Sequence, residues 1–187
     1  HTNEYWRNMK TLNSFLETTE YKWIKNLFIN TGKYLSALNY IVEYQPKVIV
    51  EYGGGQSTLM ITELVNYLDY GGKVIGYESD EYWYTKHIES GWNKHNNIKL
   101  VDIEQLDGPA GNIRYVHSLD EIVGVDFVIL DGPDLSKFTP YPETIYNLKD
   151  IVDNLGKEVP YFIDGRDGFR RFHSELGYTT DIGDIKL

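Results

Sequence analysis

The chain has 187 residues and a formal net charge of −10, a length that suits one domain with a substantial core. It contains no cysteine, which excludes disulfides and cysteine-metal sites and fits a reducing, cytoplasmic compartment. No apolar run approaches the ~20 residues of a membrane span, and so acidic a chain would repel a phosphate backbone, so we expect neither a membrane nor nucleic acid as a partner.

The first 45 residues are expected to form helices. Apolar residues recur at helical spacing in two stretches, 23–28 and 35–42, and Pro46 ends the pattern. Residues 1–45 are therefore interpreted as N-terminal helices of the same domain, serving as a lid or as a packing segment.

From Pro46 onward, short apolar runs alternate with helical patterns. Strands that are apolar on both faces and alternate with helices predict a mostly parallel sheet covered by helices on both faces. The expected fold is thus a three-layer, Rossmann-like α/β fold, with a short hairpin in the last ten residues. In chain order we expect a strand at 48–50, a helix over 61–68, a strand at 74–77, a helix over 80–90, a strand at 98–101, a short helix at 118–121, a strand at 125–130, a helix over 145–155, a strand at 159–163 and a helix over 169–176.

Carboxylates follow four of the predicted strands directly, namely Glu51, Glu78, Asp131 and Asp164. Because the carboxyl ends of parallel strands lie along one edge of a sheet, these acids are expected to gather where such sheets bind ligands. For each acid alone, a structural role as a helix cap or as a partner of a helix dipole is as good an interpretation as ligand binding. Four together, one of them beside a glycine-rich turn, favour a binding site for a positively charged ligand.

The turn after the first strand is rich in glycine and ends in two hydroxyl residues. Glycines let a ligand approach the backbone without meeting a Cβ, and Ser57 and Thr58 can cap the next helix or donate to a ligand. A dinucleotide fingerprint would place Gly at position 58, and an acid before the turn suits a pyrophosphate poorly. Glu78 lies 23 residues after Gly55, close to the ~20 typical of an acid that binds a ribose diol. We therefore infer a ligand with a ribose and a positive charge.

The pattern Glu51-x-Gly53-x-Gly55-x-Ser57-Thr58, with Glu78 ending the next strand, resembles class I S-adenosylmethionine-dependent methyltransferases. The stretch VDFVILDGPD resembles a subset of these enzymes with Asp-Gly-Pro after strand four. The resemblance covers roughly residues 46–187, which would be a methyltransferase-like catalytic domain. It implies S-adenosyl-L-methionine as cofactor and a seven-stranded sheet with an antiparallel last strand, which the final hairpin would supply in shortened form.

The resemblance also implies roles for single residues. Glu51 would lie near the methionine ammonium, and Glu78 would accept from both ribose hydroxyls. The adenine would lie near the loop 102–119, where His117 and Ser118 are candidates. The residues implied in cofactor binding are Glu51, Gly53, Gly54, Gly55, Ser57, Thr58 and Glu78.

Asp131 and Asp164 are the candidate catalytic residues. One hypothesis is that they bind a divalent cation that holds an acceptor diolate. The family's metal-dependent members usually carry Asn after the second acid, where this chain has Gly165. The second hypothesis makes Asp131, or a histidine, a general base without metal. Phe138, Tyr141 and Arg166 are further candidates to face the acceptor.

The expected function is S-adenosylmethionine-dependent methyl transfer to a small polar acceptor, with oxygen as the favoured acceptor atom. Two alternatives stay open: an NAD(P)-dependent oxidoreductase and a non-catalytic protein that binds a nucleoside cofactor. The sequence does not give the oligomeric state or the acceptor.

Overall fold

The computed structural model describes residues 2–18, 24, 34–106, 112–138, 142, 144–165 and 167–184, with residues 2–5 described by their backbone alone. Tyr141 and Arg166, two candidates for the acceptor site, lie outside these residues, as does most of the apolar stretch 23–28. Within the described part, no helix combines the length and the apolar character needed to cross a membrane.

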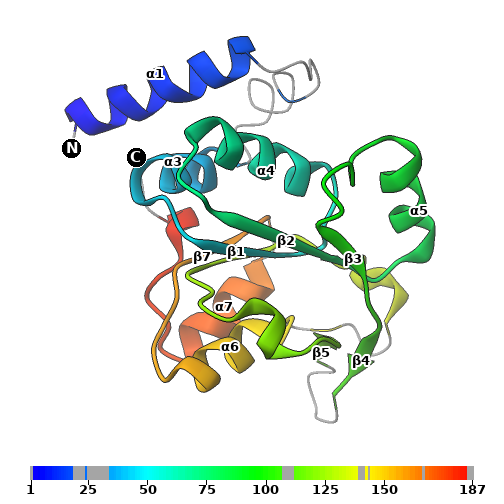
Figure 1. Cartoon of the computed structure of the whole chain (residues 1–187). Coiled ribbons are helices and arrows are strands. Elements are labelled where there is room, and N and C mark those ends of the chain that lie inside the picture. Colours follow the sequence, from blue (N-terminus) through cyan, green and yellow to red (C-terminus); the bar gives the residue numbers. More distant parts are fainter. Residues whose placement is uncertain are drawn as a thin grey trace.

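A five-stranded parallel sheet forms the centre of the molecule (Figure 1). Its strands have the order β3-β2-β1-β6-β7 and correspond one by one to the five predicted strands. The chain runs outward from β1 through β2 and β3, and then returns to build β6 and β7 on the other side. The strand order therefore reverses between β1 and β6, the place where Rossmann-like folds bind ligands. The strands are β1 (Val48–Tyr52), β2 (Lys73–Glu78), β3 (Ile98–Leu100), β6 (Phe127–Leu130) and β7 (Tyr161–Ile163).

Helices cover both faces of the sheet, as predicted (Figure 1). One core packs α1, α3 and α4 against the sheet through residues such as Leu12, Leu38 and Leu64. The opposite core packs α6 and α7 through Leu148 and Phe169. The N-terminal helices thus share the core of the sheet. The helix bounds are α1 (Thr2–Thr18), α3 (Leu35–Tyr44), α4 (Gln56–Leu68), α5 (Glu81–Glu89), α6 (Asn147–Leu155) and α7 (Asp167–Glu175), with 3-10 helices η1 (Leu119–Ile122), η2 (Leu135–Lys137) and η3 (Ile182–Asp184).

The antiparallel hairpin of this fold lies in the middle of the chain. Strands β4 (Ile103–Gln105) and β5 (Ile113–Tyr115) pair antiparallel, in a region where the sequence predicts only a loop. The predicted C-terminal hairpin is absent from residues 178–184. There Asp181 forms a single parallel bridge with Tyr161 and η3 follows, so the described sheet has five strands and not seven.

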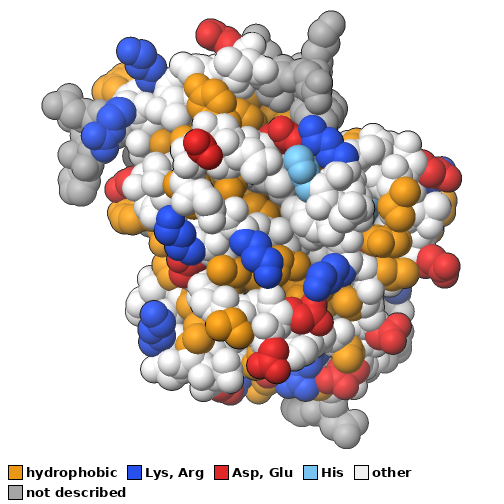
Figure 2. All heavy atoms as spheres, viewed as in Figure 1, with side chains coloured by type: hydrophobic (Ala, Val, Ile, Leu, Met, Phe, Trp, Pro, Cys, Tyr) orange, Lys and Arg blue, Asp and Glu red, His pale blue; other side chains and the backbone are white. Residues whose placement is uncertain are grey.

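Charged side chains of both signs are interspersed on the face of the molecule seen in Figure 2. Apolar side chains show between them on the same face. This distribution is typical of an ordinary solvated surface.

Candidate functional site

The strand register brings three of the four predicted acids to one edge of the sheet. Tyr52 pairs with Tyr77 on one side and with Leu130 on the other, so Glu78 and Asp131, which directly follow these partners, flank the turn after β1. Asp164 stands one strand further out, after β7.

Glu51 is placed differently from the prediction because β1 is longer than its apolar run. The strand continues to Tyr52, so Glu51 lies inside the strand and not at its end. Side chains alternate between the two faces of a strand. Glu51 therefore projects on the face covered by α4, where it is completely buried, and it is not among the residues that line the cavity described next.

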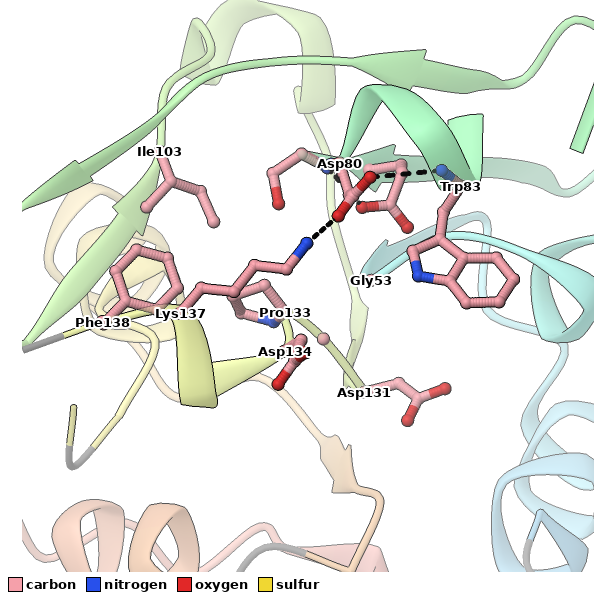
Figure 3. Close-up of a pocket in the computed structure, with 12 residues that line it drawn as sticks. Gly53, Asp80, Trp83, Ile103, Asp131, Pro133, Asp134, Lys137 and Phe138 are labelled. Carbon is pink, nitrogen blue, oxygen red and sulfur yellow. Dashed lines mark hydrogen bonds and ion pairs between the residues drawn. The ribbon is translucent and has the colours of Figure 1, made fainter. Parts of the chain in front are cut away.

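A cavity of about 460 Å³ opens where the strand order reverses (Figure 3). Its walls come from the turn after β1, the end of β2, the loop after β6, and single residues of α5 and β4. Its volume falls within the range of sites for small molecules and cofactors. The lining residues are Gly53, Glu78, Ser79, Asp80, Trp83, Ile103, Asp131, Gly132, Pro133, Asp134, Lys137 and Phe138.

Glu78, the predicted ribose-binding acid, is held firmly in the cavity wall. Its Oε1 accepts hydrogen bonds from the backbone amides of Ser79 at 2.6 Å and Asp80 at 2.8 Å. The side chain is only 12% exposed. Since a carboxylate can accept about four hydrogen bonds, Oε2 keeps the capacity to accept from a ligand.

The cavity is mainly acidic and has apolar side chains at two ends. Figure 3 shows Trp83 at one side and Ile103 with Phe138 at the other. The Lys137 ammonium spans the space to the carboxylate of Asp80 and lowers the pKa of that carboxyl group. The lining includes four carboxyl groups and one ammonium group, so the cavity suits a cationic ligand with an apolar part.

Asp80 also fixes the start of α5. Its Oδ1 accepts from the backbone amides of Tyr82 at 2.9 Å and Trp83 at 3.3 Å, as expected of a helix N-cap. This cap orients the first turn of α5 toward the cavity and places Trp83 in its wall.

A buried polar cluster connects Glu51 with the cavity. The Tyr34 hydroxyl donates to Asp131 Oδ2 at 2.6 Å and lies 3.4 Å from Glu51 Oε1. The hydroxyl of Thr58 donates to the other oxygen of Glu51. Burial and the nearby charge of Asp131 raise the pKa of Glu51 to about 8, although hydrogen bonds from Ser57 and Thr58 oppose this shift. Glu51 is therefore protonated at neutral pH, and the predicted hydroxyl pair serves this buried acid.

The three glycines of the turn lie in close contact with other parts of the protein, and the space at Gly53 is too small for a Cβ. A Cβ on Gly53, whose φ is +94°, would lie 2.1 Å from the backbone nitrogen of Gly132. A Cβ on Gly54 would lie 3.0 Å from Gly76 Cα, and one on Gly55 would lie 3.1 Å from the ring of His87. The glycines thus let the turn pack closely against β2, α5 and the loop after β6. Gly53 alone of the three also lines the cavity.

The two predicted catalytic acids are separated. Asp131 lines the cavity, whereas Asp164 is buried outside it, and its backbone amide donates to the carbonyl of Leu130 at 3.0 Å. Among the described residues, no three His, Asp or Glu side chains gather in a way that could hold a metal ion. The metal hypothesis therefore gains no support from the described part of the chain.

The candidates for the adenine, His117 and Ser118, do not line the cavity. His117 Nε2 lies 2.8 Å from the Tyr52 hydroxyl, and its ring stacks on Tyr77 at 4.2 Å. Burial lowers the pKa of His117. Ser118 caps η1 by accepting from Asp120. From the described part of this region, Ile103 of β4 lines the cavity.

Three residues of the site were missed by sequence reasoning. Tyr34 reaches Asp131 from 97 positions away, and no local pattern announces such a contact. Its spacing in the sequence could have indicated Trp83. It stands three residues after the helix cap Asp80, and so lies in the first turn of α5 beside the edge of the sheet. His87 is 5% exposed and lies under the turn, and no motif in the sequence singles it out.

Comparison with known proteins adds no assignment to this geometry. No protein-family model matches the chain, and no curated protein matches its sequence. The functional interpretation therefore rests on the residues and geometry of the cavity.

Proposed function

We propose that this protein is an S-adenosylmethionine-dependent methyltransferase that acts on a small polar acceptor, with oxygen as the favoured acceptor atom. The observation that carries the proposal is the fixed carboxylate of Glu78 in the wall of an acidic cavity at the point where the strand order reverses.

The lining of the cavity fits the three parts of the cofactor. Glu78 offers a fixed acceptor for a ribose diol. Asp131, beside the glycine turn, offers negative charge to the sulfonium group. Ile103 and Phe138 form apolar walls suited to a flat base. The volume of about 460 Å³ suits a nucleoside cofactor together with a small acceptor.

The protein's own contribution to methyl transfer would be to orient the acceptor, exclude water and accept a proton. The cofactor, when bound, supplies an already activated methyl group for in-line displacement at the sulfonium carbon. The acceptor hydroxyl must then lose its proton at or before attack. Asp131 is the predicted catalytic acid that lines the cavity, and the hydrogen bond from Tyr34 at 2.6 Å fixes its orientation. We assign the role of proton acceptor to Asp131.

The oxidoreductase alternative is disfavoured by the backbone amides of the glycine turn. The amides of Gly53 and Gly54 both donate to the carbonyl of Tyr77 at 2.8 Å, and the amide of Gly55 donates to Thr58 Oγ1 at 2.9 Å. A pyrophosphate at a helix N-terminus needs free amides of this kind. Here they are already occupied within the protein.

Thermal-shift measurements with S-adenosylhomocysteine and with NAD test the proposal. At about 100 times its Kd, a ligand stabilises the folded state by about 2.7 kcal/mol, which corresponds to roughly 5–10 °C for a chain of this size. We expect such a shift with S-adenosylhomocysteine and none with NAD. Glu78→Gln should lose most of the shift, whereas Glu81→Gln, a change at an exposed residue of α5, should keep it. Stabilisation by NAD alone would refute the proposal.

A further inference from the structure

His87 lies directly behind the ribose-binding carboxylate. It belongs to the last turn of α5, and its Nε2 is 3.7 Å from Oε2 of Glu78. The residue is 5% exposed, and within the described part of the protein neither ring nitrogen has a hydrogen-bond partner. Buried polar groups without partners are costly. This histidine therefore calls for an explanation beyond packing, because an apolar side chain would fill the same space at lower cost.

The surroundings hold the imidazole close to Glu78. Its ring lies against the glycine turn, since a Cβ on Gly55 would be 3.1 Å from Cε1. The backbone carbonyl of His87 accepts from the amides of Trp92 at 2.8 Å and Asn93 at 3.1 Å, which fixes the end of α5. The ring also contacts Trp92, with 5.5 Å between ring centroids. An approach of about 0.8 Å between Nε2 and Oε2 is enough to form a charge-assisted hydrogen bond.

We propose that His87 is a positioning residue for Glu78, whose Nε2–H donates to Oε2 when a ribose diol binds. The two oxygens of Glu78 are supported unequally without a ligand. Oε1 accepts from two backbone amides, whereas among the described residues Oε2 has only the more distant imidazole on its buried side. A donor behind Oε2 fixes the plane of the carboxylate and keeps its outer lone pairs for the ribose hydroxyls. This inference rests on the proposed function, because it assigns the ribose of the cofactor to Glu78.

The test is a double-mutant cycle for the binding of S-adenosylhomocysteine, measured by isothermal titration calorimetry. His87→Phe keeps a ring of similar size but removes the donor, and His87→Gln keeps an N–H donor at similar reach. Each is measured alone, and His87→Phe is also combined with Glu78→Gln. Melting temperatures without ligand identify any loss of folding. The ¹⁵N chemical shift of Nε2 in the unmodified protein, with and without S-adenosylhomocysteine, gives a readout that needs no variant.

Four results are expected. His87→Phe weakens binding at least about tenfold, as expected for loss of a hydrogen bond to a charged group, and His87→Gln stays within about threefold of the wild type. In the Glu78→Gln background, His87→Phe costs less than about threefold, because the group it supports is gone. The Nε2 shift moves when the ligand binds.

Two kinds of failure are distinguishable. If the wild type binds S-adenosylhomocysteine but the losses of binding free energy in His87→Phe and Glu78→Gln are additive, His87 only packs and the inference is wrong. The same holds if His87→Gln binds as weakly as His87→Phe while both variants are folded. An Nε2 shift that does not change on binding leads to the same conclusion. If the wild type does not bind the ligand at all, the proposed function itself is overturned, and the inference with it.

Discussion

Glu51→Gln tests whether the buried carboxyl group in β1 holds a proton in the folded protein. The pKa of Glu51 is raised to about 8 by burial and by the charge of Asp131, from an ordinary value of 4.5. Between these two values, the unfolded chain releases a proton that the folded protein keeps. The free energy of unfolding must therefore fall as the pH rises through this window. Glutamine resembles the protonated carboxyl group in shape but does not titrate, so the variant lacks this contribution.

The size of the effect follows from the two pKa values. Their difference of about 3.5, at 1.36 kcal/mol for each pKa unit, corresponds to on the order of 5 kcal/mol over the whole window. Between pH 5 and pH 8, the wild type should lose roughly 3–4 kcal/mol more than Glu51→Gln. Groups common to both proteins cancel in this comparison. At pH 8 the variant should be the more stable protein.

Urea unfolding followed by circular dichroism at pH 5, 6.5 and 8 measures this difference. Glu175→Gln, a change at an exposed residue of α7, is the matched control and should follow the wild type at every pH. If the unfolding free energies of the wild type and Glu51→Gln fall in parallel from pH 5 to pH 8, Glu51 is ionised in the folded protein and the reasoning about its burial is wrong.

Three further predictions concern the site and its frame. Gly53→Ala should destabilise the protein by more than about 3 kcal/mol, because its Cβ would lie 2.1 Å from Gly132. Gly71 also has a positive φ, but a Cβ there would meet nothing within 4 Å, so Gly71→Ala should cost only about 1–2 kcal/mol. If urea unfolding shows equal losses of unfolding free energy for the two variants, the close contact at Gly53 does not have the predicted effect. Tyr34→Phe removes the 2.6 Å hydrogen bond to Asp131 and should lower the unfolding free energy by about 1–2 kcal/mol, and an unchanged value would show that this bond adds nothing. Asp131→Asn should abolish the conversion of S-adenosylmethionine to S-adenosylhomocysteine in the presence of acceptor. Its Kd for S-adenosylhomocysteine should stay within about threefold of the wild-type value. Normal turnover by this variant would show that Asp131 has only a structural role.

The parallel sheet was predictable because its strands are short apolar runs buried on both faces. Val48–Tyr52 and Phe127–Leu130 are examples in which nearly every side chain is buried. The hairpin β4–β5 escaped prediction because its strands mix apolar with charged residues, as in Ile113–Tyr115 with Arg114 at its centre. Such three-residue strands carry too little periodicity to be distinguished from a loop.

The site was predictable only in part. The spacing after the glycine turn predicts Glu78 at the edge of the sheet, and the structure places its carboxylate in the cavity wall, where two backbone amides donate to it. The position of Glu51 depended on where β1 ends. The apolar run predicts an end at residue 50, but the strand continues to Tyr52, so Glu51 lies within it and is buried. Tyr34 and His87 were missed because their contacts depend on the packing of distant elements. No local pattern carries that information.

A crystal structure of the protein with S-adenosylhomocysteine tests the central claim most directly. We predict that the ribose hydroxyls lie within hydrogen-bond distance, about 2.5–3.0 Å, of the carboxylate of Glu78. The base should lie between Ile103 and Phe138, which line the cavity. A nucleoside bound elsewhere on the protein, or a ribose turned away from Glu78, would contradict the account.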